Sequence, residues 1–176
     1  MVNTNALPAG GVLTQRQAEA PIERQVRRMT RLVDGLFDVS RLNRGRLHLL
    51  LERTDLRCVV SNAIETAQPL IQERHHRLAS VLPDKPVWLQ GDPYRLEQVF
   101  VNLLANASRY TDSGGELSVW VHTRHGQAIV RIRDSGLGIA PEALRKLIES
   151  HRGSVTAASG GLGRGSEFTV RLPTEE

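Results

Sequence analysis

Several features that would restrict the function of a protein are scarce in this sequence. It contains one cysteine, Cys58, so an internal disulfide and a metal site of clustered cysteines are both excluded. Aromatic residues make up only 4% of the chain, so the core must consist mainly of aliphatic side chains. No stretch approaches the run of about 18 apolar residues typical of a membrane span, and the first residues lack a signal-peptide pattern. We expect a cytoplasmic protein without direct membrane insertion.

Lysine is also scarce: the chain has only Lys85 and Lys146, so its net charge of +4 depends on arginine. These arginines are dispersed and few aromatic side chains lie between them, which does not indicate a nucleic-acid partner. Hydrophobic residues make up 40% of the 176 residues. This length suits one compact domain with a helical extension and is too short for two full catalytic domains.

The beginning of the chain divides into two segments. Residues 1–20 show no hydrophobic periodicity and are predicted to be a flexible leader. Over residues 22–44, apolar side chains recur at alternating spacings of four and three, which predicts a long amphipathic helix before Gly45. This helix either packs on its own domain or pairs with another helix, within the chain or across a dimer. The sustained spacing favours pairing.

Helical and strand patterns alternate through residues 51–176. A helix is predicted after Thr54 and Asp55, and a second helix begins at Pro93 with Asp92 as its N-cap. Further elements are expected as strands at 77–82, 87–90, 116–123, 127–134, 154–159 and 167–172, and as a short helix at 141–151. This order predicts an α+β fold, a two-layer sandwich in which helices cover one face of a mixed sheet.

Two asparagines, Asn102 and Asn106, lie one turn apart in the helix predicted after Pro93, and Arg109 and Tyr110 extend their face. Asparagine is unfavourable inside helices because its amide competes for backbone hydrogen bonds. The pair is either a polar pair on a solvated face or a source of oxygen ligands for Mg²⁺, with a cation nearby for phosphate.

A second motif, D-S-G-L-G-I at residues 134–139, directly follows a predicted strand. A carboxylate at a strand end can accept a hydrogen bond from an exocyclic amine, and glycines let the backbone turn beside a planar ligand. Taken alone, the motif fits a tight turn equally well. It does not indicate a dinucleotide-binding fold, because no third glycine opens a following helix.

Together and in this order, the segments DPYRLEQVFVNLLANASRYT and DSGLGIAPEAL resemble the ATP-binding domain of sensor histidine kinases. This domain belongs to a superfamily that includes topoisomerase, mismatch-repair and chaperone ATPases. The asparagine segment resembles the N box and the glycine segment resembles the G1 box. The ending SGGLGRGSEFTVRLP is similar to the last hairpin, and residues 22–49 are similar to the second helix of the dimerisation and phosphotransfer hairpin.

The resemblance covers about residues 21–173 and implies a dimerisation helix at 21–50 and an ATP-binding domain at 51–176. In that domain Asn106 would coordinate Mg²⁺, Arg109 and Tyr110 would lie near the phosphates, and Asp134 would accept from the adenine amine beside the hydroxyl of Ser166. The implied ATP-binding residues are Asn102, Asn106, Arg109, Tyr110, Asp134, Gly136, Gly138 and Ser166. The implied partners are a response regulator or an intact histidine kinase, with a possible homodimer through residues 22–44.

The sequence departs from the family in two places. No segment resembles the family motif that carries the phosphate-accepting histidine, so a complete chain of this sequence is not expected to autophosphorylate in cis at the usual site. After the G1 box, residues 141–147 run straight into a segment that resembles the end of the helix following the ATP lid. We interpret the lid and its glycine box as deleted, and residues 161–165 as a hairpin turn because a strand follows them.

The missing lid would remove backbone N–H groups that normally hold phosphates. We therefore expect weak or lost binding of ATP and Mg²⁺, and weak or no protein-histidine kinase activity. The shortened helix is also expected to expose apolar surface near Leu144, Leu147 and Ile148.

The leading hypothesis is a truncated sensor histidine kinase catalytic domain of a two-component system. The alternative is a non-catalytic dimerisation or interaction module. A serine kinase or anti-sigma factor of the same superfamily is disfavoured because those proteins lack the long preceding helix.

Overall fold

A computed structural model describes residues 49–136, 142–159 and 164–175. The described residues all lie within one unit of the chain, residues 48–176. The predicted leader and the helix predicted at 22–44 lie outside the described residues, as does Gly138. The proposed division at residues 20 and 50 therefore stays a prediction.

Each of the two long helices begins at an aspartate that accepts a hydrogen bond from the first turn. Helix α2 (Leu56–Glu73) follows Asp55, whose side chain accepts from the N–H of Arg57 at 3.1 Å. Helix α3 (Pro93–Tyr110) follows Asp92, whose side chain accepts from the N–H of Arg95 at 3.1 Å. Both predicted N-caps are confirmed.

A five-stranded mixed sheet forms the second layer. Its strands in spatial order are β2 (Arg77–Val81), β4 (Glu116–Arg124), β5 (Gln127–Asp134), β7 (Ser166–Pro173) and β6 (Ser154–Ser159). Strand β2 is parallel to β4 and the other neighbours are antiparallel. A separate pair joins β1 (Glu52–Asp55) to β3 (Trp88–Gly91). The α+β prediction is confirmed, whereas β1 was not predicted.

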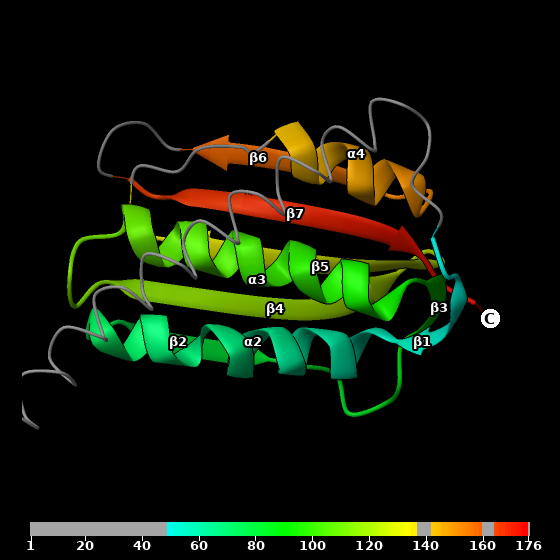
Figure 1. Cartoon of the computed structure of the whole chain (residues 1–176), viewed down its shortest axis with the longest axis horizontal. Coiled ribbons are helices and arrows are strands. Elements are labelled where there is room, and N and C mark those ends of the chain that lie inside the picture. The colour runs from blue at the N-terminus through cyan, green and yellow to red at the C-terminus, as the bar shows by residue number, and fades with distance from the viewer. Residues whose placement is uncertain (1–48, 137–141, 160–163, 176) are drawn as a thin grey trace, which may run out of the picture. The chain divides into compact units, whose positions relative to one another are not determined.

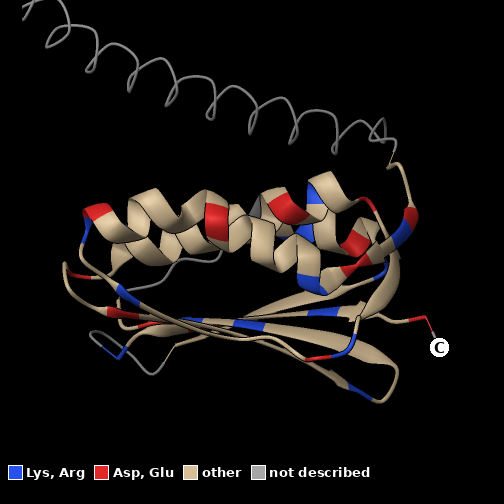
Figure 2. Ribbon diagram, turned by 90° about the horizontal axis from the view of Figure 1, so that it is seen from below, with Lys and Arg blue, Asp and Glu red and all other residues tan. Residues whose placement is uncertain are grey.

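Helices α2, α3 and α4 (Glu142–Ser150) lie on the same face of the sheet (Figures 1 and 2). The apolar stripe of α3 is fully buried, as its spacing predicted, and comprises Leu96, Val99, Phe100, Leu103, Leu104 and Ala107. It meets the alternate residues of the sheet that point towards the helices, among them Leu117, Val119, Val130 and Ile132. No described helix covers the other face.

The expectation of exposed apolar surface on the short helix is wrong. Leu144, Leu147 and Ile148 are only 6%, 6% and 0% exposed. Helix α4 is short but still buries these three side chains, because the helix contacts both β6 and α3. Only residues 135–141 separate the end of β5 from the start of α4. Among the described residues, no helix is both long and apolar enough to cross a membrane.

Candidate functional site

The carboxylate of Asp134 is the most buried acidic group of the described chain, with a side chain at the end of β5 that is 2% exposed. It faces the helix layer, since its register partner Leu117 is buried there. One oxygen, Oδ1, accepts hydrogen bonds from the N–H of Gly136 at 2.8 Å and from the N–H of Ser166 at 3.3 Å. The other oxygen, Oδ2, has no partner.

Burial raises the pKa of the Asp134 carboxyl above its usual value, and the two backbone N–H groups oppose this shift only in part. A buried carboxylate oxygen without a partner is costly to the fold. A ligand with an N–H donor at Oδ2 would remove that cost. The arrangement therefore suits a neutral donor such as an amine on a flat ring.

Two buried hydroxyls in the described chain also lack hydrogen-bond partners, the Oγ of Ser166 and the Oγ1 of Thr111. Ser166 is paired with Asp134 in the strand register, and Thr111 directly follows α3 against the backbone of Gly136. Unsatisfied buried polar atoms are rare in folded proteins, and a group of them indicates a ligand or water site. Ser166 was predicted for this site and Thr111 was not.

Two glycines allow the chain segments around Asp134 to approach one another. A Cβ on Gly136 would collide with the carbonyl group of Tyr110 at the end of α3. Gly165 has a φ of +77°, which favours glycine, and a Cβ there would collide with the carbonyl oxygen of Asp134. Gly136 was predicted as part of the pocket wall. Gly165 was assigned only to a hairpin turn, because sequence spacing does not reveal a contact with β5.

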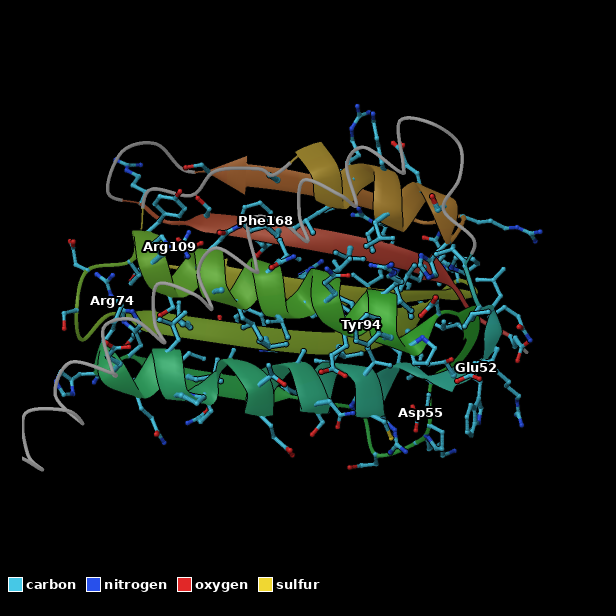
Figure 3. All side chains as sticks on the ribbon, in the orientation of Figure 1. Glu52, Asp55, Arg74, Tyr94, Arg109 and Phe168 are labelled. Atoms are coloured by element: carbon cyan, nitrogen blue, oxygen red, sulfur yellow. The ribbon has the colours of Figure 1, made fainter. Side chains whose placement is uncertain are left out.

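The predicted face of α3 reaches the same end of the sheet. Asn102 and Arg109 are exposed, whereas Asn106 and Tyr110 are half-buried. Figure 3 shows Arg109 at the C-terminal end of α3, at the opposite end from Tyr94. Because Tyr110 and Thr111 lie against Gly136, the C-terminal end of α3 is brought beside Asp134. The fold thus brings Tyr110, at the end of α3, beside Gly136 of the G1-box segment. Asn102 lies midway along the helix, and Gly138 lies outside the described residues.

No cluster of three or more His, Cys, Asp or Glu side chains that could hold a metal occurs in the described part of the chain. A resident all-protein metal site is therefore not indicated there. An Asn amide oxygen and a nearby arginine instead suit Mg²⁺ that arrives with phosphates, since Mg²⁺ keeps several waters and takes few protein ligands.

Comparison with known proteins gives the family. Residues 91–150 match the model described as "Histidine kinase-, DNA gyrase B-, and HSP90-like ATPase". The sensor histidine kinase TrcS of Mycobacterium tuberculosis is 36% identical over an alignment with 93% of this chain and 37% of that protein. The histidine-protein kinase BaeS of Escherichia coli is 35% identical, with 87% of this chain and 33% of that protein covered. The chain thus spans about a third of these relatives' length.

Solved structures agree on the fold. The Acinetobacter baumannii histidine kinase AdeS superposes with a TM-score of 0.75 at 23% identity, covering 97% of this chain and 88% of that chain. The catalytic domain of the histidine kinase ThkA gives 0.62 at 19% identity, covering 70% of this chain and 96% of that chain. The matched family and the sequence relatives agree, and the chain therefore carries an ATPase domain of the histidine-kinase type.

Proposed function

We propose that this chain is a truncated catalytic domain of a sensor histidine kinase and that it binds an adenine nucleotide beside Asp134. The observation that carries the proposal is the unpartnered Oδ2 of the buried Asp134 carboxylate next to the unpartnered hydroxyl of Ser166. The adenine amine can donate to this oxygen, and ring nitrogens can accept from the hydroxyl. The family activity is ATP-dependent phosphorylation of a protein histidine.

The remaining roles follow from the positions along α3. Asn106 would offer its amide oxygen to Mg²⁺, and Asn102 lies one turn away on the same helix. Arg109 and Tyr110 would lie near the phosphates at the C-terminal end of α3. Bound Mg²⁺ would neutralise phosphate charge during transfer. The backbone of Gly136 would form the wall beside the adenine.

The short connection between β5 and α4 supports the proposal that the ATP lid is missing. Residues 135–141 leave no room for both a lid and a second glycine box. The alignment to TrcS extends over 195 positions and yet includes only 93% of a 176-residue chain, which also supports a segment missing here. The lid and its glycine box would supply backbone N–H groups that hold the phosphates, so their loss should weaken phosphate positioning more than adenine recognition. We expect weak nucleotide binding and little or no turnover.

The proposed partner is a response regulator or an intact histidine kinase. ThkA, a protein of the same fold, has been seen in complex with the response regulator protein TrrA. Residues 22–44 would form a helix that pairs with another helix, either in a homodimer or with the partner.

The alternative function is a non-catalytic interaction module. The same short β5–α4 connection favours it, because a domain without its lid can retain its partners after losing turnover.

Calorimetric titration of Mg-ATP and Mg-ADP into the full chain tests the nucleotide site. We expect weak binding that Asp134→Ala and Asn106→Ala both abolish. The matched controls Asp84→Ala and Asn62→Ala change exposed residues outside the site and should bind like the parent. Absence of heat from a folded sample would favour the interaction module. Robust autophosphorylation from labelled ATP would contradict the expected weak nucleotide binding and lack of kinase activity.

A further inference from the structure

The face of the sheet opposite the helices carries a group of arginines. Side chains alternate along a strand, so Ser118, Trp120 and Arg133 point away from the helices when their neighbours Leu117, Val119 and Asp134 point towards them. In Figure 2, blue segments of Lys and Arg occur along the strands, and the described helices lie on one side of the sheet only.

This face is hollowed at the end of the sheet near Asp134. A cavity of about 650 Å³ is lined by Arg77, Ala79, Ser118, Trp120, Arg133 and Arg164, among others. Ala79 and Ser118 are opposite one another in the parallel pair of β2 and β4, so two small side chains form its floor. Trp120 supplies an aromatic wall. Asp134 and Ser135 also line this cavity, so it adjoins the proposed nucleotide site, although the carboxylate of Asp134 points to the helix layer on the other face of the sheet.

The cavity has an excess of positive charge on its open side. The lining contains three arginines and two acidic residues, Glu116 and Asp134. Arg77 pairs with Glu116 at 2.8 Å, and the exposed Arg133 and Arg164 supply the remaining positive charge. The carboxylate of Asp134 is directed to the other face, where it accepts from backbone N–H groups. Glu167 is opposite Arg133 in the strand register and weakens the positive field from outside the cavity.

We propose that this cavity docks an acidic, extended segment of a protein partner. Guanidinium groups bind carboxylates in a bidentate geometry, which matches the two arginines at its rim. Arginine and tryptophan are also the residue types that most often dominate protein interfaces. A bare sheet face of this length accommodates an extended chain. The cavity opens on the face of the sheet opposite the Asp134 carboxylate, so docking there does not require a bound nucleotide.

Tryptophan fluorescence provides a direct test, because the chain has only two tryptophans. Trp88 packs under the guanidinium of Arg53 at 4.3 Å, outside this cavity, so Trp88→Phe leaves Trp120 as the sole reporter. A short oligoglutamate peptide is titrated into the full chain with this substitution. We expect a saturable change in Trp120 emission that weakens with added salt and that an oligolysine peptide does not produce.

Variants distinguish this site from general charge attraction. Combining Arg133→Gln with Arg164→Gln should raise the dissociation constant about tenfold. Glu167→Gln should lower it, because an opposing charge is removed. Arg171→Gln changes an arginine on the same face but outside the cavity and should leave the constant unchanged. A folded sample without a saturable signal, or equal weakening by Arg171→Gln, would overturn the proposal.

Discussion

The ring of His151 joins the end of α4 to the beginning of α3. Its Nε2 accepts a hydrogen bond from the backbone N–H of Asp92 at 3.1 Å, and its Nδ1 donates to the carbonyl of Leu147 at 2.8 Å. The Asp92 side chain in turn accepts from the N–H of Leu50 at 3.1 Å. The segment that enters the domain, the N-cap of α3 and the last turn of α4 are therefore held at one point. Only the neutral imidazole can make both histidine bonds.

This arrangement predicts a loss of stability at mildly acidic pH. Burial lowers the pKa of His151 below its ordinary 6.5, although the Leu147 carbonyl and Asp92 oppose the shift. The unfolded chain therefore binds the proton more readily than the folded chain. The stabilisation from the two hydrogen bonds of neutral His151 is complete above about pH 6.5 and is lost as the pH falls towards the pKa of His151 in the folded protein. The loss is about 1.4 kcal/mol for each unit by which the pKa is lowered. Urea unfolding from pH 8 to pH 5 measures it.

Two variants check the assignment to His151. In His151→Gln the pH dependence between pH 5 and pH 7 should largely disappear, with lower stability at neutral pH. His125→Asn changes an exposed turn histidine, where asparagine also tolerates the φ of 50°, and should keep the full dependence. An unchanged slope in His151→Gln would contradict the prediction.

Asp134→Asn should separate stability from nucleotide binding. The amide oxygen keeps the bonds from Gly136 and Ser166, and the buried charge whose pKa is raised is removed. We expect an unchanged or higher free energy of unfolding, by about 1 kcal/mol. Calorimetric nucleotide binding should be lost, since the new NH₂ group cannot accept from the adenine amine. Loss of stability together with binding would assign Asp134 a structural role instead.

Gly136→Ala should damage the fold at the proposed site. The added methyl would meet the backbone of Tyr110, which cannot move as a side chain can, so we expect a destabilisation of about 3 kcal/mol. In Gly114→Ala the new methyl meets no atom within 4 Å, and only its φ of +81° opposes the change. That control should lose about 1 kcal/mol. Thermal unfolding of both variants gives the comparison, and equal losses would exclude the clash as the cause.

Asp55→Ala should weaken the start of α2. Burial alone would raise the pKa of this carboxyl, but hydrogen bonds from the Arg57 side chain and from the N–H groups of Val87 and Arg57 outweigh it and lower the pKa. The stabilisation is therefore present above about pH 3.8 and is lost as the pH falls below that value. At neutral pH the lost cap should cost about 2 kcal/mol in urea unfolding. Asp84→Ala, at an exposed turn, should cost little.

Local chemistry explains why much of the fold was predictable. The caps Asp55 and Asp92 act within three residues of their positions, and the apolar spacing of α3 records which side faces the sheet. The hairpin of β4 and β5 follows from alternating side chains around His125 and Gly126, both of which have a positive φ. Asp134, Gly136 and Ser166 were assigned to one site by family resemblance, and the fold brings these three together.

The remaining features depend on residues far apart in the chain. Strand β1 has charged residues and no alternation, and it exists because it pairs with β3 and because the Thr54 hydroxyl donates to the Gly91 carbonyl at 3.1 Å. His151 reaches Asp92 across 59 positions, and Gly165 is required only because β5 passes beside it. The sequence by itself determined the elements, their caps and the family of the site. Only the tertiary structure decided which buried atoms lack partners, that α4 stays covered and that arginines from separate strands share one hollow, because each of these depends on contacts between distant segments.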